Sequence, residues 1–102
     1  MRNFIAAVCL SAMAGLTMAA DVLWIDVRSA GEYSMGHLPQ ALNIPYTDIS
    51  SEIGAYANSK KQPIKLYCGS GRRAGIAKEV LEEMGYTSVS NEGGYEALIA
   101  ND

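Results

Sequence analysis

Beyond residue 20, short apolar runs alternate along the chain with stretches whose apolar residues lie one helical turn apart. The runs are rich in strand-forming residues and predict buried strands. The stretches, such as the one carrying Ile49, Ile53 and Tyr56, predict helices with one buried face. The predicted strands are 21–27, 41–44, 64–67 and 87–90. The predicted helices are 30–35, 47–58, 72–84 and 94–100, with a turn at 91–94.

Polar residues and glycines mark the ends of these helices. Ser29 followed by Glu32 fits a capping box, and Gly85 is placed to end the helix at 72–84. Strands that alternate with helices predict an α/β fold, in which a parallel sheet carries helices on both faces. Ligands of such sheets bind beyond the carboxyl ends of the strands, and Cys68 lies at one of these ends.

The first twenty residues have a different composition from the rest of the chain. Arg2 is their only charge, an apolar run follows, and small residues end the segment. This pattern is typical of a secretory signal peptide, with cleavage favoured after Ala19. A membrane anchor is the alternative, but the run is short and diluted by small and polar residues. We therefore expect residues 1–20 to be removed, leaving a domain over 21–102 that is periplasmic or secreted.

Length and charge exclude several classes of protein. A chain of 102 residues fits one small domain, and its formal net charge of −3 argues against a nucleic-acid binder. Because Arg2 is the only charge of residues 1–20, their removal shifts the net charge to −4. The chain's two cysteines and one histidine, His37, make a poor zinc site. The remaining domain has one cysteine, Cys68. In an oxidising compartment Cys68 would have no disulfide partner within the chain.

The segment from Cys68 to Arg73 joins a predicted strand to a predicted helix. Gly69 and Gly71 let the backbone turn several N–H groups inward, which forms an anion-binding nest. The start of the following helix adds positive potential, and Arg72 and Arg73 add two charges. All of these effects favour a thiolate over a thiol. The segment thus predicts an activated sulfur nucleophile in an anion-binding pocket.

Three functions could use this segment. Cys68 could carry sulfur as a persulfide, or it could attack a phosphate ester or arsenate. Cysteine phosphatases place five residues between cysteine and arginine, whereas Arg72 and Arg73 follow Cys68 after three and four. This shorter spacing favours the persulfide. Residues 69–74 also fit a dinucleotide-binding pattern, but a domain of about 82 residues cannot supply both halves of that fold.

Several motifs follow one another across residues 21–102. They are Trp24-Ile25-Asp26-Val27-Arg28, Glu32-Tyr33, the segment 36–45, Leu66-Tyr67-Cys68-Gly69-Ser70-Gly71-Arg72-Arg73, Met84-Gly85-Tyr86 and Gly93-Gly94-Tyr95. Together they resemble the single-domain rhodanese (thiosulfate sulfurtransferase) family, and most of all its small periplasmic members of the phage-shock-protein E type. In this family a six-residue loop from the catalytic cysteine marks sulfurtransferases and a seven-residue loop marks phosphatases.

The resemblance implies a rhodanese-like three-layer fold with a parallel sheet of four or five strands. It implies that Cys68 is the nucleophile that bears the persulfide, and that either Arg72 or Arg73 orients the sulfonate of thiosulfate. It also implies that the turn at Gly93 and Gly94 approaches the pocket. The residues expected to cradle the terminal sulfur and bind substrate are Gly69, Ser70, Gly71, Arg72 and Arg73.

The expected reaction moves a sulfane sulfur from thiosulfate or a similar small anionic donor to cyanide or a thiol. It needs no metal or organic cofactor. The expected protein is a monomer that binds no nucleic acid and, after cleavage, no membrane. The alternatives are a non-catalytic binding module with the rhodanese fold and, less favoured, a cysteine-dependent phosphatase or arsenate reductase.

The remaining charged residues are interpreted as structural. Asp26 is expected to be hydrogen-bonded, and an Arg28–Glu32 pair is expected to brace the capping box. His37 lies in a turn and is expected to have a structural role. Lys60 and Lys61 are expected to lie in a solvated loop.

Overall fold

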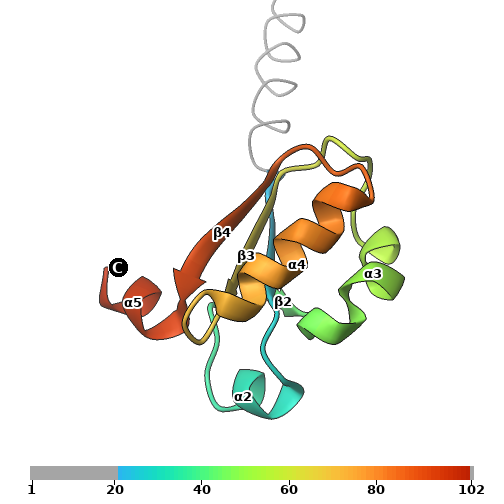
Figure 1. Cartoon of the computed structure of the whole chain (residues 1–102). Helices are drawn as coiled ribbons and strands as arrows, with labels where there is room; N and C mark the ends of the chain where they lie inside the picture. The colour runs from blue at the N-terminus through green and yellow to red at the C-terminus, as the bar shows by residue number, and fades with distance from the viewer. Residues whose placement is uncertain (1–20, 102) are drawn as a thin grey trace, which may run out of the picture.

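The computed structural model describes residues 21–101, which form a four-stranded sheet with helices packed against it (Figure 1). All neighbouring strands pair in parallel, in the order β2-β1-β3-β4. The predicted α/β fold with a parallel sheet of four or five strands is confirmed, with four strands. These are β1 (Leu23–Asp26), β2 (Ala41–Asn43), β3 (Ile64–Cys68) and β4 (Val89–Gly94).

Successive side chains of each strand point to opposite faces of the sheet and build two separate cores. On one face pack α3 (Ile49–Glu52) and α4 (Arg72–Glu83), and α4 crosses in front of the strands in Figure 1. On the other face α5 (Tyr95–Ala100) packs Tyr95 and Leu98 against Tyr67. The larger core, under α3 and α4, includes Ile25, Ile44, Ile49, Ile53, Ile64, Leu66, Cys68, Ala77 and Leu81.

Two predicted boundaries are wrong, each for a tertiary reason. The helix predicted over 47–58 is broken into a 3-10 turn (Tyr46–Asp48), the single α-turn of α3 and a second 3-10 turn (Ile53–Ala55). Ile49 and Ile53 are buried as predicted, but Tyr56 is 46% exposed. Because Tyr56 does not pack against the core, it does not extend the helix to residue 58. The turn predicted at 91–94 belongs to β4, because pairing with β3 continues through it.

The two helix-end signals at Ser29 and Gly85 agree with the structure. Ser29 and Glu32 form the capping box of α2 (Ala30–Ser34), each side chain accepting a hydrogen bond from the other's backbone N–H. Gly85 follows α4 in a left-handed conformation, with φ of 101°. Its N–H donates to the carbonyl of Glu82, and that of Tyr86 donates to the carbonyl of Leu81. This pair of bonds is the Schellman motif that glycine permits.

The expected signal peptide, residues 1–20, lies outside the described residues, so its prediction is untested. Within residues 21–101, no helix is long and apolar enough to cross a membrane.

Lys60 and Lys61 are exposed in the loop before β3, as expected, and Lys60 also makes defined contacts there. Its Nζ donates to the carbonyl of Met84 at 2.9 Å and lies 4.3 Å from the ring centre of Tyr86. Its own carbonyl accepts a bond from the N–H of Thr87. A cation at the last turn of α4 also suits the negative end of the helix dipole.

We expect Lys60→Ala to lower the free energy of unfolding by about 1 kcal/mol, because a hydrogen bond and a cation–π contact are lost together. Chemical denaturation followed by circular dichroism measures this change. The matched control is Lys61→Ala, since the ammonium group of Lys61 makes no hydrogen bond or ion pair within residues 21–101. Equal stabilities of the two variants would contradict the role given to Lys60.

Candidate active site

Cys68 ends β3, and a tight loop connects it to α4. The residue is fully buried, at the carboxyl edge of the sheet where ligands of parallel sheets bind. Gly71 precedes α4 with φ of 100°, a left-handed conformation that favours glycine. This turn directs backbone N–H groups at the Cys68 Sγ, which lies 3.0 Å from the nitrogen of Gly71 and 3.4 Å from that of Ala74. The predicted nest of N–H groups is therefore present.

These N–H groups determine the acidity of the thiol. Burial by itself raises the pKa of Cys68, because it removes water from the thiolate. Backbone hydrogen bonds stabilise the thiolate and outweigh burial, so the pKa lies below its ordinary value. The N–H groups responsible are those of Ala74, Ser70, Gly71 and Arg73.

Arg73 forms a two-pronged ion pair with Glu32. Its two terminal nitrogens lie 2.8 Å and 3.0 Å from the two carboxylate oxygens. Arg73, and then the N–H of Ser29, lower the pKa of Glu32 to about 2, so the pair stays charged into the acidic range. The pair joins the capping box of α2 to the first turn of α4 (Figure 1 shows α2 beyond the strand ends, on the side where α4 begins).

The pairing expected between Arg28 and Glu32 is wrong. Arg28 instead binds Asp26, with 2.7 Å between its terminal nitrogen and the carboxylate, and both residues are buried. The same nitrogen of Arg28 donates to the carbonyl of Gly36, and its guanidinium lies 4.5 Å from the ring centre of Tyr95. Asp26 is hydrogen-bonded, as expected. This buried pair fixes the chain segments around the carboxyl edge of the sheet.

The structure separates the two arginines that the sequence left as alternatives. Arg73 is half-buried and engaged with Glu32. Arg72 is exposed at the start of α4 and takes part in no ion pair among residues 21–101. Gly69 and Ser70 are exposed beside it. Among the described residues, Arg72 is therefore the arginine of this segment whose guanidinium is free of an ion pair.

The end of β4 lies against the loop, as the resemblance implied for the turn at Gly93 and Gly94. A methyl group on Gly94 would collide with the carbonyl of Gly69, so only glycine permits this approach. The side chain of Asn91 also reaches the loop, where its amide donates to the carbonyl of Gly71. Sequence reasoning missed Asn91, because a contact between residues twenty positions apart leaves no mark in local spacing.

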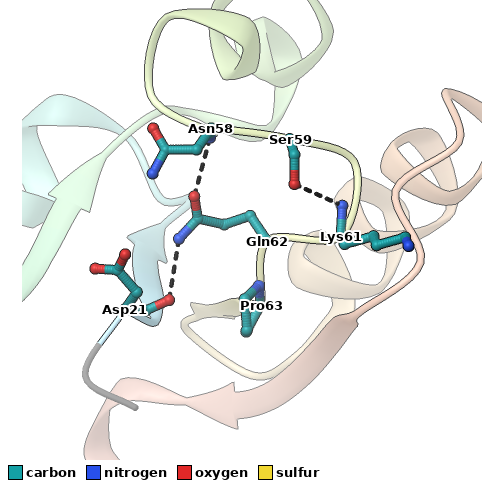
Figure 2. A pocket seen from close by; sticks show the side chains of 6 residues that line it. All are labelled: Asp21, Asn58, Ser59, Lys61, Gln62 and Pro63. Atoms are coloured by element: carbon teal, nitrogen blue, oxygen red, sulfur yellow. Dashed lines mark hydrogen bonds between the residues drawn. The ribbon is translucent and has the colours of Figure 1, made fainter. Parts of the chain in front are cut away.

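Two other features lie apart from this chemistry. His37 stacks on the ring of Tyr33 and bonds its carbonyl, contacts that fit the structural role expected for it. A shallow crevice between Asp21 and the loop 58–63 is bridged by Gln62 (Figure 2). Because Pro63 directly precedes β3, the crevice lies at the end of the sheet opposite Cys68. Residues 21–101 contain no group of three or more metal-binding side chains.

Comparisons with known proteins agree with this geometry. The family model described as "Rhodanese-like domain" matches residues 11–101. Thiosulfate sulfurtransferase PspE of Escherichia coli K12 is 45% identical over 71 residues, which cover 70% of this chain and 68% of the relative. A Saccharomyces cerevisiae thiosulfate:glutathione sulfurtransferase is 31% identical over 81 residues, covering 69% of this chain and 58% of the relative.

Two solved structures share the fold. One, described as a rhodanese with anions from E. coli, is 43% identical with a TM-score of 0.71, covering 74% of this chain and 88% of that one. The other, the human single-domain sulfurtransferase TSTD1, is 25% identical with a TM-score of 0.72, covering 91% of this chain and 94% of that one. The match over most of the sequence, together with the four-stranded fold and the loop that follows β3, shows that this chain belongs to the rhodanese-like family.

Proposed function

We propose that the protein is a sulfurtransferase that carries sulfane sulfur as a persulfide on Cys68. The observation that carries the proposal is the buried sulfur of Cys68, with the N–H groups of Gly71 and Ala74 directed at it. Such a cradle stabilises a thiolate before the reaction and the negative outer sulfur of a persulfide after it. The thiosulfate sulfurtransferases among the relatives support thiosulfate, or a similar small anion, as the donor.

The reaction proceeds in two displacements. The Cys68 thiolate attacks the outer sulfur of thiosulfate, the S–S bond breaks, and sulfite leaves with the bonding electron pair. The acceptor, cyanide or a thiolate, then attacks the outer sulfur of the Cys68 persulfide. Thiocyanate or a new persulfide leaves, and the Cys68 thiolate is restored. Neither displacement requires an external oxidant, a metal ion or an organic cofactor.

The two arginines have different tasks in this proposal. Arg72, exposed and unpaired among the described residues, binds the sulfonate of the donor. Arg73 is a positioning residue, because its guanidinium is held by Glu32 while its backbone N–H contributes to the thiolate's stabilisation. Gly69, Ser70 and Gly71 supply the backbone of the cradle. Anions in the E. coli rhodanese structure are consistent with an anion site in this fold.

We expect Cys68→Ser to abolish thiocyanate production from thiosulfate and cyanide, a fall of at least about a hundredfold, because the hydroxyl cannot replace the thiolate. Colorimetric detection of thiocyanate measures the rate. The control is Thr87→Ser, an equally small change on the exposed surface. Equal, slow release by wild type and Cys68→Ser would contradict the enzyme and favour a binding module.

We expect Arg72→Gln to raise the KM for thiosulfate about tenfold with kcat changed less than about threefold, because a charge-assisted contact with the donor is lost. Arg73→Gln should instead lower kcat, since Glu32 loses its partner and the loop shifts. Steady-state kinetics with varied thiosulfate separates the two effects.

Lys61→Gln is the control for these variants, because it removes the same charge at the opposite end of the sheet. It should leave both constants unchanged. A raised KM in Arg73→Gln, with an unchanged KM in Arg72→Gln, would reverse the assignment of the two arginines.

We also propose that residues 1–20 direct export and that the monomeric domain acts in the periplasm or outside the cell. Intact-mass measurement of the protein from the extracytoplasmic fraction tests this proposal. The expected mass is that of a chain cut at the end of the leader, after Ala19 or Ala20. A full-length chain held in the membrane would contradict it.

A further inference from the structure

The strand beside the nucleophile contains a β-bulge. Leu66 of β3 pairs with Asn91 of β4, and Cys68 pairs with Gly94. Between these two pairs β3 advances by two residues and β4 by three, so β4 contains one extra residue. Gly93, inside the bulge, has φ of 96°, a conformation that favours glycine. Such bulges re-aim side chains near the ends of strands.

Asn91 ties this bulge to the nucleophile loop. Its Oδ1 accepts a hydrogen bond from the N–H of Gly93 at 2.9 Å, which closes the turn of the bulge. Its Nδ2 donates to the carbonyl of Gly71, also at 2.9 Å. That carbonyl accepts the first helical bond from Gly75 as well, so both of its lone pairs are used. One side chain therefore spans the bulge and the start of α4.

Gly71 connects the side chain of Asn91 to the sulfur of Cys68, because it is bonded to both. Its N–H lies 3.0 Å from the Sγ of Cys68, whereas its carbonyl is held by Asn91. It precedes α4 and has no side chain that could cap the helix. Its backbone is in the left-handed conformation, which glycine adopts readily. A residue so free needs an external bond to hold its two flanking peptide groups in one orientation.

Building on the proposed function, we propose that Asn91 is a positioning residue, which fastens the β4 bulge to Gly71 and so holds the Gly71 N–H against the Cys68 sulfur. The Glu32–Arg73 ion pair holds the end of the loop at the start of α4, and the hydrogen bond from Asn91 holds the Gly71 carbonyl from β4. Asn91 itself is exposed and buries little surface. Replacing Asn91 should therefore change the reactivity of the Cys68 thiol more than it lowers the stability of the fold.

The test compares Asn91→Ala and Asn91→Asp with Asn58→Ala. Asn91→Ala removes both bonds. Asn91→Asp keeps the acceptor for the Gly93 N–H but replaces the donor to the Gly71 carbonyl with a carboxylate oxygen. Asn58 is the matched control, because it is exposed at the opposite end of the sheet (Figure 2). Its side chain makes no hydrogen bond to the loop that follows Cys68.

Two readouts are needed, and the first is independent of sulfur transfer. The rate of iodoacetamide alkylation against pH gives the pKa of the Cys68 thiol. For both Asn91 variants we expect this pKa to rise, with alkylation below the pKa slowed about tenfold. We expect kcat for thiosulfate and cyanide to fall about tenfold and KM for thiosulfate to change less than about threefold, because Arg72 is untouched.

Asn58→Ala should match wild type in both readouts. If Asn91→Ala has the same alkylation profile and the same kcat as wild type, the inference is overturned and the proposed function stays intact. An inactive wild type would overturn the proposed function, and the alkylation profiles would still decide the role of Asn91. If Asn91→Ala does not fold, Asn91→Asp decides alone, since it keeps the bond that shapes the bulge.

Discussion

The contact between the buried sulfur of Cys68 and the backbone N–H groups around it is the constraint on which the site depends. A thiolate removed from water is costly unless hydrogen-bond donors replace the water. Here the donors are backbone N–H groups, and the nitrogen of Gly71 lies 3.0 Å from the sulfur. Peptide groups cannot rotate like side chains, so the acidity of the sulfur follows directly from the path of the loop.

That path is fixed from several sides. The ion pair of Arg73 with Glu32 connects the start of α4 to the capping box of α2. The end of β4 approaches so closely that Gly94 has no room for a side chain. At the end of the neighbouring strand β1, Arg28 pairs with the buried Asp26 and donates to the carbonyl of Gly36. The loop is short and rich in glycine, and its neighbours supply the rigidity that its own sequence lacks.

Local signals predicted the elements well, because their physical causes are local. The apolar run before Cys68, the capping box at Ser29 and the left-handed Gly85 all act within a few residues. Contacts between distant segments were missed or misassigned. Glu32 pairs with Arg73, forty-one positions away, in place of the nearer Arg28. Spacing along the chain predicted a nucleophile at Cys68 and the loop that follows it, but only the folded sheet shows which groups hold that loop in place.

If Cys68 carries a transferable sulfur, intact-mass spectrometry detects that sulfur on the protein itself. The purified domain is treated with thiosulfate, measured, treated with cyanide and measured again. We expect a gain of one sulfur atom located on Cys68, lost again when cyanide is added, with thiocyanate formed in equal amount. No gain of sulfur on Cys68, or a gain that cyanide cannot remove, would contradict this role of Cys68.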